Sequence, residues 1–481
     1  MKRFLVICIL ITLLFTNISP SVVEASSKTD STKEKSEKVD KNCWPKGPSG
    51  KSLSADSAIV MELSTGLILY EKNIHKEHYP ASITKIMTSL LCLENSSLGE
   101  TVTFSHDAIY GIERNSSHIG IDVDEQLTME QCLYAIMLES ANEASLGVAE
   151  HVAGDISSFA DMMNAKAKEL GCENTHFANP NGLHNDNHYT SAYDMALISK
   201  AAMENSTFRK ITSTKRYTIP PTNKQSETRY LRNHQQMLNP YNYPQYEYEY
   251  CIGGKTGYTT DALATLVTFA EKDGMDLVCV VMRAASPSLN VNEYTDTINL
   301  LNFAFENYTK YTTTDTDTTE NLDSSPFFTK YNYLFSKEDS PLQVSNDASV
   351  VLPITAEYKE AQKQVTYYSD IKLQDGENII GNISYTYGGK TVGSSDIIFN
   401  KISAPKLVST IPEKKTEREN KTPNVDEHSK FPVALGITLL LLLASILIFL
   451  LMKPMKKYTN NYRNRKKTKE TFDQSFTDFK L

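Results

Sequence analysis

Two uncharged apolar stretches near the ends of the chain limit what each part of it can fold into. The first runs from Phe4 to Phe15 behind Lys2-Arg3 and precedes Val23-Glu24-Ala25. A basic flank, a short apolar core and a small-residue cleavage site are typical of a secretory signal peptide. The second runs from Phe431 to Met452 and is long enough to cross roughly 30 Å of hydrocarbon as a helix. Globular domains are therefore expected only between them.

The charge of the C-terminal tail indicates how the chain would sit in a membrane. From Lys453 onward there are nine basic and three acidic residues, whereas the 481-residue chain carries a net charge of −9. Positive charge beside a span stays on the cytoplasmic side. We therefore expect a single-pass protein of the cell membrane, extracytoplasmic except for its tail. The chain before Lys453 is acidic and has no broad basic surface, so nucleic acid is excluded as a partner.

Composition divides the chain into eight segments. Polar, charged or Pro-containing stretches separate two units that have enough apolar residues to fold. The predicted segments are a signal peptide (1–25), a disordered lead-in (26–53), a first folded unit (54–310), a linker (311–326), a small β-sandwich-like domain (327–404), a stalk (405–430), a transmembrane helix (431–452) and a basic cytoplasmic tail (453–481).

The first unit begins and ends with strand-like patterns around a helical body. Apolar runs at 58–61 and 67–70 flank Ser64-Thr65-Gly66 and predict a β-hairpin. Helical spacing follows, and strand-like runs return at 265–269 and 277–281 before a closing helix at 294–308. This order predicts the α+β class.

The second unit has a different pattern. Apolar residues alternate with polar ones in several short runs, and Gly388-Gly389 supplies a turn between two of them. We predict a small all-β domain.

The cysteines and histidines do not suggest a metal site. The seven cysteines lack the short paired spacing of zinc ligands or of a disulfide framework, so we interpret most as small buried apolar residues. His184 and His188 lie in a polar loop, where solvated side chains are the simpler interpretation. We expect neither a metal nor another cofactor.

Three short motifs contain side chains that could take part in catalysis. Ser82 is followed three positions later by Lys85, so the amine can reach the hydroxyl on one helix face and act as the base that a serine nucleophile needs. Ser140-Ala141-Asn142 interrupts a helical pattern, and Lys255-Thr256-Gly257 opens a strand after two glycines. One S-x-x-K alone is a weak signal. The three in this order are the set described for serine β-lactamases and penicillin-binding proteins.

The chain resembles the low-molecular-weight penicillin-binding proteins that act as serine-type D-alanyl-D-alanine carboxypeptidases. The resemblance runs from about Ser54 to Tyr308 and departs from the family at Glu143, where aspartate is usual, and at Leu263, where glycine is usual. It implies a penicillin-binding/β-lactamase-like transpeptidase domain, with a helical cluster on an antiparallel sheet. Besides the motifs, it rests on residues 79–88, 177–183, 190–196, 233–234 and 254–259.

The resemblance implies catalytic roles for three residues. Ser82 would attack the carbonyl of the penultimate D-alanine in peptidoglycan stem peptides and become an acyl-enzyme. Lys85 would take the serine proton, and Ser140 would relay a proton toward the leaving amine. The same residues would accept β-lactam antibiotics, whose strained amide mimics the scissile bond.

It also implies a binding role for the other motif residues. Asn142 would hold the substrate amide, and Lys255 with Thr256 would bind the terminal carboxylate. Gly257 and Tyr258 continue the same strand, and the backbone N–H groups of Ser82 and Tyr258 would form an oxyanion hole.

Two alternatives remain. A β-lactamase-like hydrolase would need a second base for the deacylating water, and the interval that holds this glutamate in class A enzymes has Asn179-Pro180-Asn181-Gly182-Leu183 instead. A non-catalytic penicillin sensor or peptidoglycan-binding protein would signal through a cytoplasmic domain, for which the tail is short and basic. The carboxypeptidase interpretation is preferred.

Overall fold

The computed structural model describes residues 44–285, 292–313, 342–345, 348–368 and 371–401. The predicted signal peptide, stalk, transmembrane helix and cytoplasmic tail lie outside these residues, and so does most of the linker. Within the described part, no helix is both long enough and apolar enough to span a membrane.

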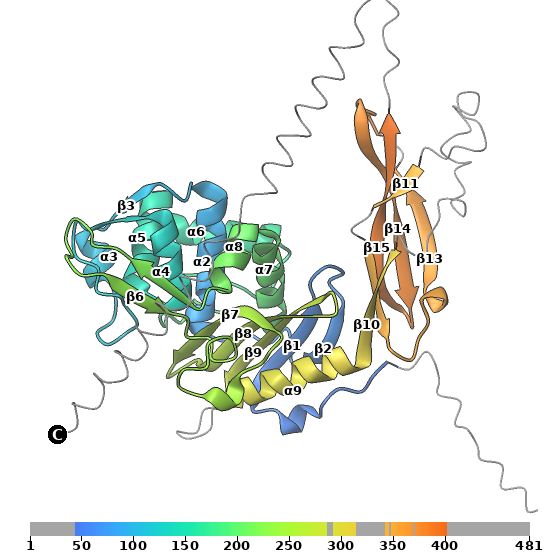
Figure 1. Ribbon diagram of the computed structural model, residues 1–481, viewed down its shortest axis with the longest axis horizontal. Coiled ribbons are helices and arrows are strands. Elements are labelled where there is room, and N and C mark those ends of the chain that lie inside the picture. Colours follow the sequence, from blue (N-terminus) through green and yellow to red (C-terminus); the bar gives the residue numbers. More distant parts are fainter. Residues whose placement is uncertain (1–43, 286–291, 314–341, 346–347, 369–370, 402–481) are drawn as a thin grey trace, which may run out of the picture. The chain divides into compact units, whose positions relative to one another are not determined.

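A five-stranded antiparallel sheet forms the middle of the first unit (Figure 1), in the order β2-β1-β9-β8-β7. The hairpin and the two later strands predicted from the apolar runs are all present. β7 forms one edge of this sheet and pairs with β8. The strands are β1 (Ala55–Glu62), β2 (Ile68–Lys72), β7 (Cys251–Thr259), β8 (Leu263–Lys272) and β9 (Met275–Ala284).

Helices cover both faces of this sheet (Figure 1). Two small two-stranded antiparallel sheets accompany them: β3 (Thr101–Thr103) with β4 (Gln126–Thr128), and β5 (Arg216–Ile219) with β6 (Arg229–Arg232). The helices on one face are α2 (Lys85–Asn95), α3 (His106–Tyr110), α4 (Met129–Leu138), α5 (Asn142–Ala153), α6 (Ile156–Glu169), α7 (Ala192–Glu204) and α8 (Ser206–Thr212), and α9 (Asn292–Asn307) lies on the other. The α+β prediction is confirmed.

The central strands are buried on both faces, because successive side chains of a strand point to opposite sides. Val278 and Val280 of β9 belong to the core beneath the helical cluster, whereas Cys279 and Val281 belong to the core beneath α9. Double burial explains why this strand has an unbroken apolar run instead of an alternating one.

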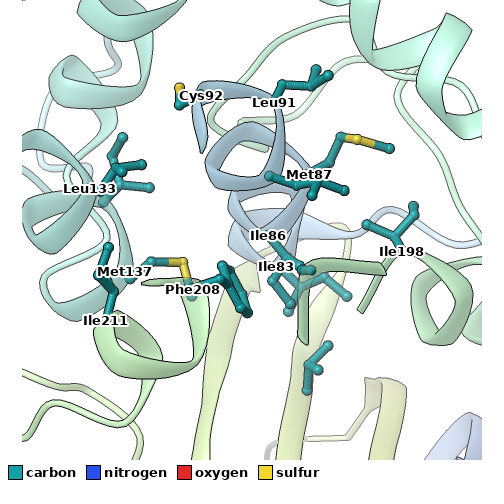
Figure 2. Close-up of a cluster of buried hydrophobic side chains, with 14 of the residues drawn as sticks. Ile83, Ile86, Met87, Leu91, Cys92, Leu133, Met137, Ile198, Phe208 and Ile211 are labelled. Carbon is teal, nitrogen blue, oxygen red and sulfur yellow. The ribbon is translucent and has the colours of Figure 1, made fainter. Parts of the chain in front are cut away.

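Helix α2 is the centre of the helical cluster. Ile86 and Met87 pack among side chains of α4, α7 and α8 (Figure 2), and every residue from Lys85 to Cys92 is buried. Close packing on all sides fixes the position of this helix and of whatever residues begin it.

Polar side chains begin most helices of the cluster. Thr128 caps α4 in a capping box with Gln131, and Ser191 caps α7. Helix α5 differs, because its N-cap is Ala141, which offers no capping side chain. The backbone N–H of Asn142 instead donates to Ser117 O at 2.9 Å.

The second unit is all β, as predicted. Its described strands are hydrogen-bonded in the order β10-β12-β15-β14-β13, with β11 on β15. Strand β10 follows α9 directly and extends across the predicted boundary at residue 310. The strands are β10 (Tyr308–Thr312), β11 (Leu342–Val344), β12 (Ser349–Pro353), β13 (Gln362–Tyr367), β14 (Gly376–Tyr387) and β15 (Lys390–Lys401).

Residues 44–53, predicted to be the end of the disordered lead-in, pack on the fold instead. The Trp44 ring lies edge-on to Tyr387, with 5.6 Å between ring centroids, and its Nε1 donates to Gly388 O at 3.3 Å. A short 3₁₀ helix, η1 (Gly50–Ser52), then leads into β1. Packing a partly buried aromatic ring against the fold offsets the entropy lost by ordering a polar segment.

Candidate active site

Ser82 lies on a 3₁₀ turn, η2 (Ala81–Thr84), that continues into α2. Ile83 points into the core beside Ile86 (Figure 2), while Ser82 itself is partly exposed. Ala81 has a φ of 52°, a left-handed conformation that costs an L-residue roughly 1–2 kcal/mol. The turn therefore presents the serine at the surface at some cost in backbone strain.

Lys85 begins α2 and is completely buried. Its Nζ lies 3.0 Å from Ser82 Oγ, 2.7 Å from Asn142 Oδ1 and 2.5 Å from Asn181 O. Burial, and secondly the positive charge of Lys255, lower the pKa of Lys85 well below its ordinary value. A neutral amine has two hydrogens and one lone pair. With the hydrogens directed to the two carbonyl oxygens, the lone pair remains for the Ser82 hydroxyl.

The Asn179–Leu183 loop, which lies where class A enzymes have their glutamate, supports the turn η2 that carries Ser82. Thr88 Oγ1 donates to Pro180 O at 2.6 Å, next to the Asn181 carbonyl that contacts Lys85. Gly182 has a φ of 83°, and a Cβ at this position would lie 2.0 Å from Ala81 O. Only glycine permits this approach.

A buried histidine completes that support. His188 Nδ1 accepts a hydrogen bond from the Ala178 N–H at 3.0 Å, so its Nε2 carries the proton and donates to Thr84 Oγ1 at 2.8 Å. Burial lowers the pKa of His188 to about 3. The prediction that His188 is a solvated loop residue is wrong, because its ring joins the loop to the nucleophile turn.

The second motif lies at the start of α5. Ser140 is buried with a φ of 60°, and its Oγ has no hydrogen-bond partner among the described residues. Two positions on, Asn142 contacts Lys85 through its side-chain oxygen. The contact between Asn142 and Lys85 thus joins the first two motifs directly. The Ser140 hydroxyl remains available to bond with a substrate.

The third motif lies on the edge strand β7. Lys255 is buried, its Nζ donates to Thr256 O at 2.9 Å, and burial lowers its pKa to about 7. A Cβ on Gly257 would lie 2.9 Å from Ser82 N, so the strand passes directly beside the nucleophile turn. Tyr258 follows and is 63% exposed.

Glu139, which the sequence analysis did not assign to the site, borders both later motifs. Its Oε2 lies 2.9 Å from His234 Nε2, and its Oε1 accepts from the Arg232 N–H at 2.6 Å. Burial alone would raise its pKa, but these hydrogen bonds lower it. Its negative charge acts on Lys255. Two features of the sequence pointed to Glu139. It directly precedes Ser140, and its partner His234 lies in residues 233–234, which share the family resemblance.

The two departures from the family have structural consequences. Leu263 has a φ of 57°, a conformation that accounts for the glycine usually found there. Glu143 is 1% exposed and lies on the same helix turn as Asn142.

The cysteines of the described part form no disulfide with one another. Its five cysteines are free, and four of them are buried. Across the same ranges, no group of three or more His, Cys, Asp or Glu side chains is placed to hold a metal ion.

The family profile described as D-alanyl-D-alanine carboxypeptidase matches residues 45–286. Among curated proteins, D-alanyl-D-alanine carboxypeptidase DacF of Bacillus subtilis is 36% identical over 53% of this chain, and the match covers 63% of the DacF length. D-alanyl-D-alanine carboxypeptidase DacC of Escherichia coli is 27% identical over 72% of this chain and 84% of its own. The solved Streptomyces K15 DD-transpeptidase is 29% identical over 55% of this chain and 100% of its own, with a TM-score of 0.49.

The chain therefore belongs to the D-alanyl-D-alanine carboxypeptidase family, a family of serine hydrolases. This confirms the family resemblance that the motifs indicated. The residue roles implied by that resemblance stay predictions.

Proposed function

We propose that this protein is a serine D-alanyl-D-alanine carboxypeptidase that removes the terminal D-alanine from peptidoglycan stem peptides and thereby limits cross-linking. The observation that carries the proposal is the environment of Lys85. Its buried amine, with a lowered pKa, lies 3.0 Å from Ser82 Oγ and meets two carbonyl oxygens on its other sides. This arrangement favours a neutral amine that can take a proton from the serine.

The reaction has two stages. Ser82 Oγ attacks the carbonyl carbon of the penultimate D-alanine while Lys85 Nζ accepts the hydroxyl proton. The tetrahedral intermediate collapses to an ester on Ser82, and the terminal D-alanine leaves after its nitrogen gains a proton through Ser140. Water then cleaves the ester and restores the Ser82 hydroxyl. In the free protein the buried Ser140 Oγ has no partner among the described residues, as a group kept for the substrate would require.

Substrate binding is assigned to β7 and α5. Because β7 is the edge strand beside the nucleophile turn, an extended peptide can add to it by backbone hydrogen bonds. Lys255, with Thr256, would pair with the terminal carboxylate, and Asn142 would hold the substrate amide. The N–H groups of Ser82 and Tyr258 would stabilise the developing oxyanion, where loss of one donor costs roughly 3–4 kcal/mol.

The same site is proposed to bind penicillin and to release it slowly. The Asn179–Leu183 loop contributes the Asn181 carbonyl to Lys85 and carries no glutamate. Among the described residues, no carboxylate is hydrogen-bonded to Ser82 or Lys85. A dedicated base for hydrolysing the penicilloyl-enzyme is therefore not apparent in this part of the chain, which disfavours the β-lactamase alternative.

Membrane attachment belongs to the proposal as well. The apolar segment 431–452 and the basic tail after it support a single-pass anchor with the catalytic unit outside the cytoplasm. Protease added to cells stripped of their wall should degrade the catalytic unit and leave a short fragment that contains the tail. Full protection of the catalytic unit would contradict this topology.

The second unit is proposed to be a spacer or partner platform above the membrane. Lys310 in β10 forms an ion pair with the buried Glu62 at 3.0 Å, so a cut after Thr312 keeps this buried charge paired. The soluble fragment that ends there should hydrolyse small peptides nearly as well as the longer chain. Loss of activity in a fragment that remains folded would contradict the spacer role.

The activity itself is tested by incubating the purified extracytoplasmic part with a pentapeptide that ends in D-Ala-D-Ala. Release of one D-alanine per peptide supports the proposal. Absence of release, with rapid turnover of penicillin, would favour the β-lactamase alternative.

A further inference from the structure

Residues 117–121 touch the start of α5 at two consecutive residues of that helix. The Asn142 N–H donates to Ser117 O at 2.9 Å, and Glu143 Oε1 accepts from the Ile119 N–H at 2.7 Å. The first contact supplies a partner for a helix N-terminus that has no capping side chain. The contact between Glu143 and Ile119 holds residues 117–121 where Ser117 O can accept from Asn142.

The start of α5 needs such support because it carries two site residues. Ser140 is held in a left-handed conformation, and the side chain of Asn142 lies 2.7 Å from Lys85 Nζ. A displacement of this turn by about 1 Å would be enough to reduce catalysis by roughly 10²-fold.

From these contacts we infer that Glu143 is a positioning residue of the active site, which fixes Ser140 and Asn142 by holding residues 117–121 against α5. The inference rests on the proposed function, since it adds a residue to the same reaction. Arg229 of β6 donates to Ile119 O and Gly120 O, so the segment has a second attachment. Removing Glu143 should therefore displace the segment locally while the fold persists.

The charge of Glu143 gives the inference a second consequence. Its Oε2 is buried without a hydrogen-bond partner among the described residues, and burial raises its pKa. It interacts electrostatically with His118 on the segment, Lys85 on α2 and Cys132 on α4. When ionised, it favours the protonated form of Lys85.

Other charges also bear on these groups. Lys255 of β7 opposes protonation of Lys85, and the neutral His188 lies near the same amine. Arg229 pairs with the buried Glu125 beside the segment at 2.7 Å. None of these groups changes in a Glu143 variant, so a shift in the pH profile reports the Glu143 charge.

Two variants separate the two consequences. Glu143→Gln keeps an oxygen for the Ile119 N–H but removes the charge, and Glu143→Ala removes both. Glu150→Gln is the matched control, because Glu150 lies on the same helix and accepts from Ser105 Oγ at 3.0 Å, away from residues 117–121.

The experiment follows acylation of the full-length protein in detergent micelles by a fluorescent penicillin between pH 5 and 9. Glu143→Gln should move the acidic limb to lower pH by on the order of half a unit, since loss of a nearby negative charge lowers the pKa of Lys85. Glu143→Ala should slow acylation by roughly 10- to 100-fold. Glu150→Gln should match the wild type. A Glu143→Ala acylation rate that equals the Glu150→Gln rate would overturn the inference.

Hydrogen exchange tests the placement independently of activity. In Glu143→Ala, the amides of residues 117–121 should exchange about tenfold faster or more, whereas Glu150→Gln should leave them unchanged. Unchanged exchange in Glu143→Ala would overturn the inference even if acylation slowed. A wild-type protein that penicillin does not label would count against the proposed function, and the exchange comparison would still decide the placement.

Discussion

Lys85 Nζ and Ser82 Oγ lie 3.0 Å apart at the start of a helix whose residues from Lys85 to Cys92 are all buried. The same amine reaches Asn142 Oδ1 at 2.7 Å, which joins two motifs that are 57 residues apart. The shared contact means that the nucleophile, its base and the substrate-amide group are positioned as one unit.

Lys85→Arg should abolish acylation while preserving the fold. An arginine guanidinium stays protonated in proteins, so it keeps a positive charge near neutral pH and cannot accept the Ser82 proton. The expected loss of acylation rate is about 10²–10⁴-fold, the usual contribution of a general base. Labelling with fluorescent penicillin measures it, and a circular dichroism melt checks folding. A folded Lys85→Arg variant with the wild-type rate would contradict the base assignment.

Substrate affinity should depend on pH through Lys255. Burial lowers its pKa to about 7, so its ammonium loses a proton as the pH of the free enzyme rises through that value. The KM for peptides with a free terminal carboxylate should then increase, by up to about tenfold per pH unit. A matched peptide with an amidated C-terminus should show no such increase.

The Lys255→Ala variant provides the complementary comparison. It should reduce kcat/KM more for the carboxylate peptide than for the amidated one, because only the former loses an ion pair. Equal losses on both peptides would show that Lys255 does not recognise the carboxylate.

Gly182→Ala should impair the nucleophile turn, and Gly171→Ala should not. Both glycines have a positive φ, 83° and 81°, so both alanine variants are strained by roughly 1 kcal/mol or more. Only the new Cβ at position 182 meets another atom, Ala81 O, whereas position 171 is open. Acylation should therefore slow in Gly182→Ala alone. Similar acylation rates in the two variants would argue against support of Ser82 by this loop.

Stability should fall in acid through His188. Its pKa is about 3 in the folded protein and about 6.5 in the unfolded chain. Between these values the unfolded state binds a proton that the folded state does not, so the free energy of unfolding decreases as pH falls. The expected slope is about 1.4 kcal/mol per pH unit from this group.

Urea unfolding at several pH values measures that slope. His188→Gln should reduce the pH dependence between about pH 6 and 4, although it should also lower stability at pH 7 by weakening the contact with Thr84. An unchanged pH dependence in the variant would contradict a buried neutral histidine.

The sequence was sufficient to predict the secondary structure around the site. The spacing of Ser82 and Lys85, the apolar run at 277–281 and the hairpin at 58–70 each follow from local periodicity, and the structure has each of them. Local patterns cannot show which distant backbone atoms meet. The Asn181 carbonyl at Lys85, and the close approach of Gly182 to Ala81, depend on tertiary packing that no periodicity reports.

Two other features of the fold have the same origin. Alternating residues in the second unit predict strands but not their order, which depends on the pairing of β15 with β11, β12 and β14. The polar composition of residues 26–53 predicts disorder. One residue, Trp44, nevertheless anchors the end of this segment through contacts with residues more than 250 positions away.

The central claim is that Ser82 is the nucleophile of a carboxypeptidase with no dedicated means of hydrolysing penicillin. Mass spectrometry of the extracytoplasmic part after reaction with penicillin tests it most directly, with D-alanine release from the pentapeptide measured on the same sample. We predict a persistent penicilloyl adduct on the peptide that contains Ser82, and loss of both adduct and D-alanine release in Ser82→Ala. An adduct on any other residue, or D-alanine release that survives in Ser82→Ala, would contradict the account.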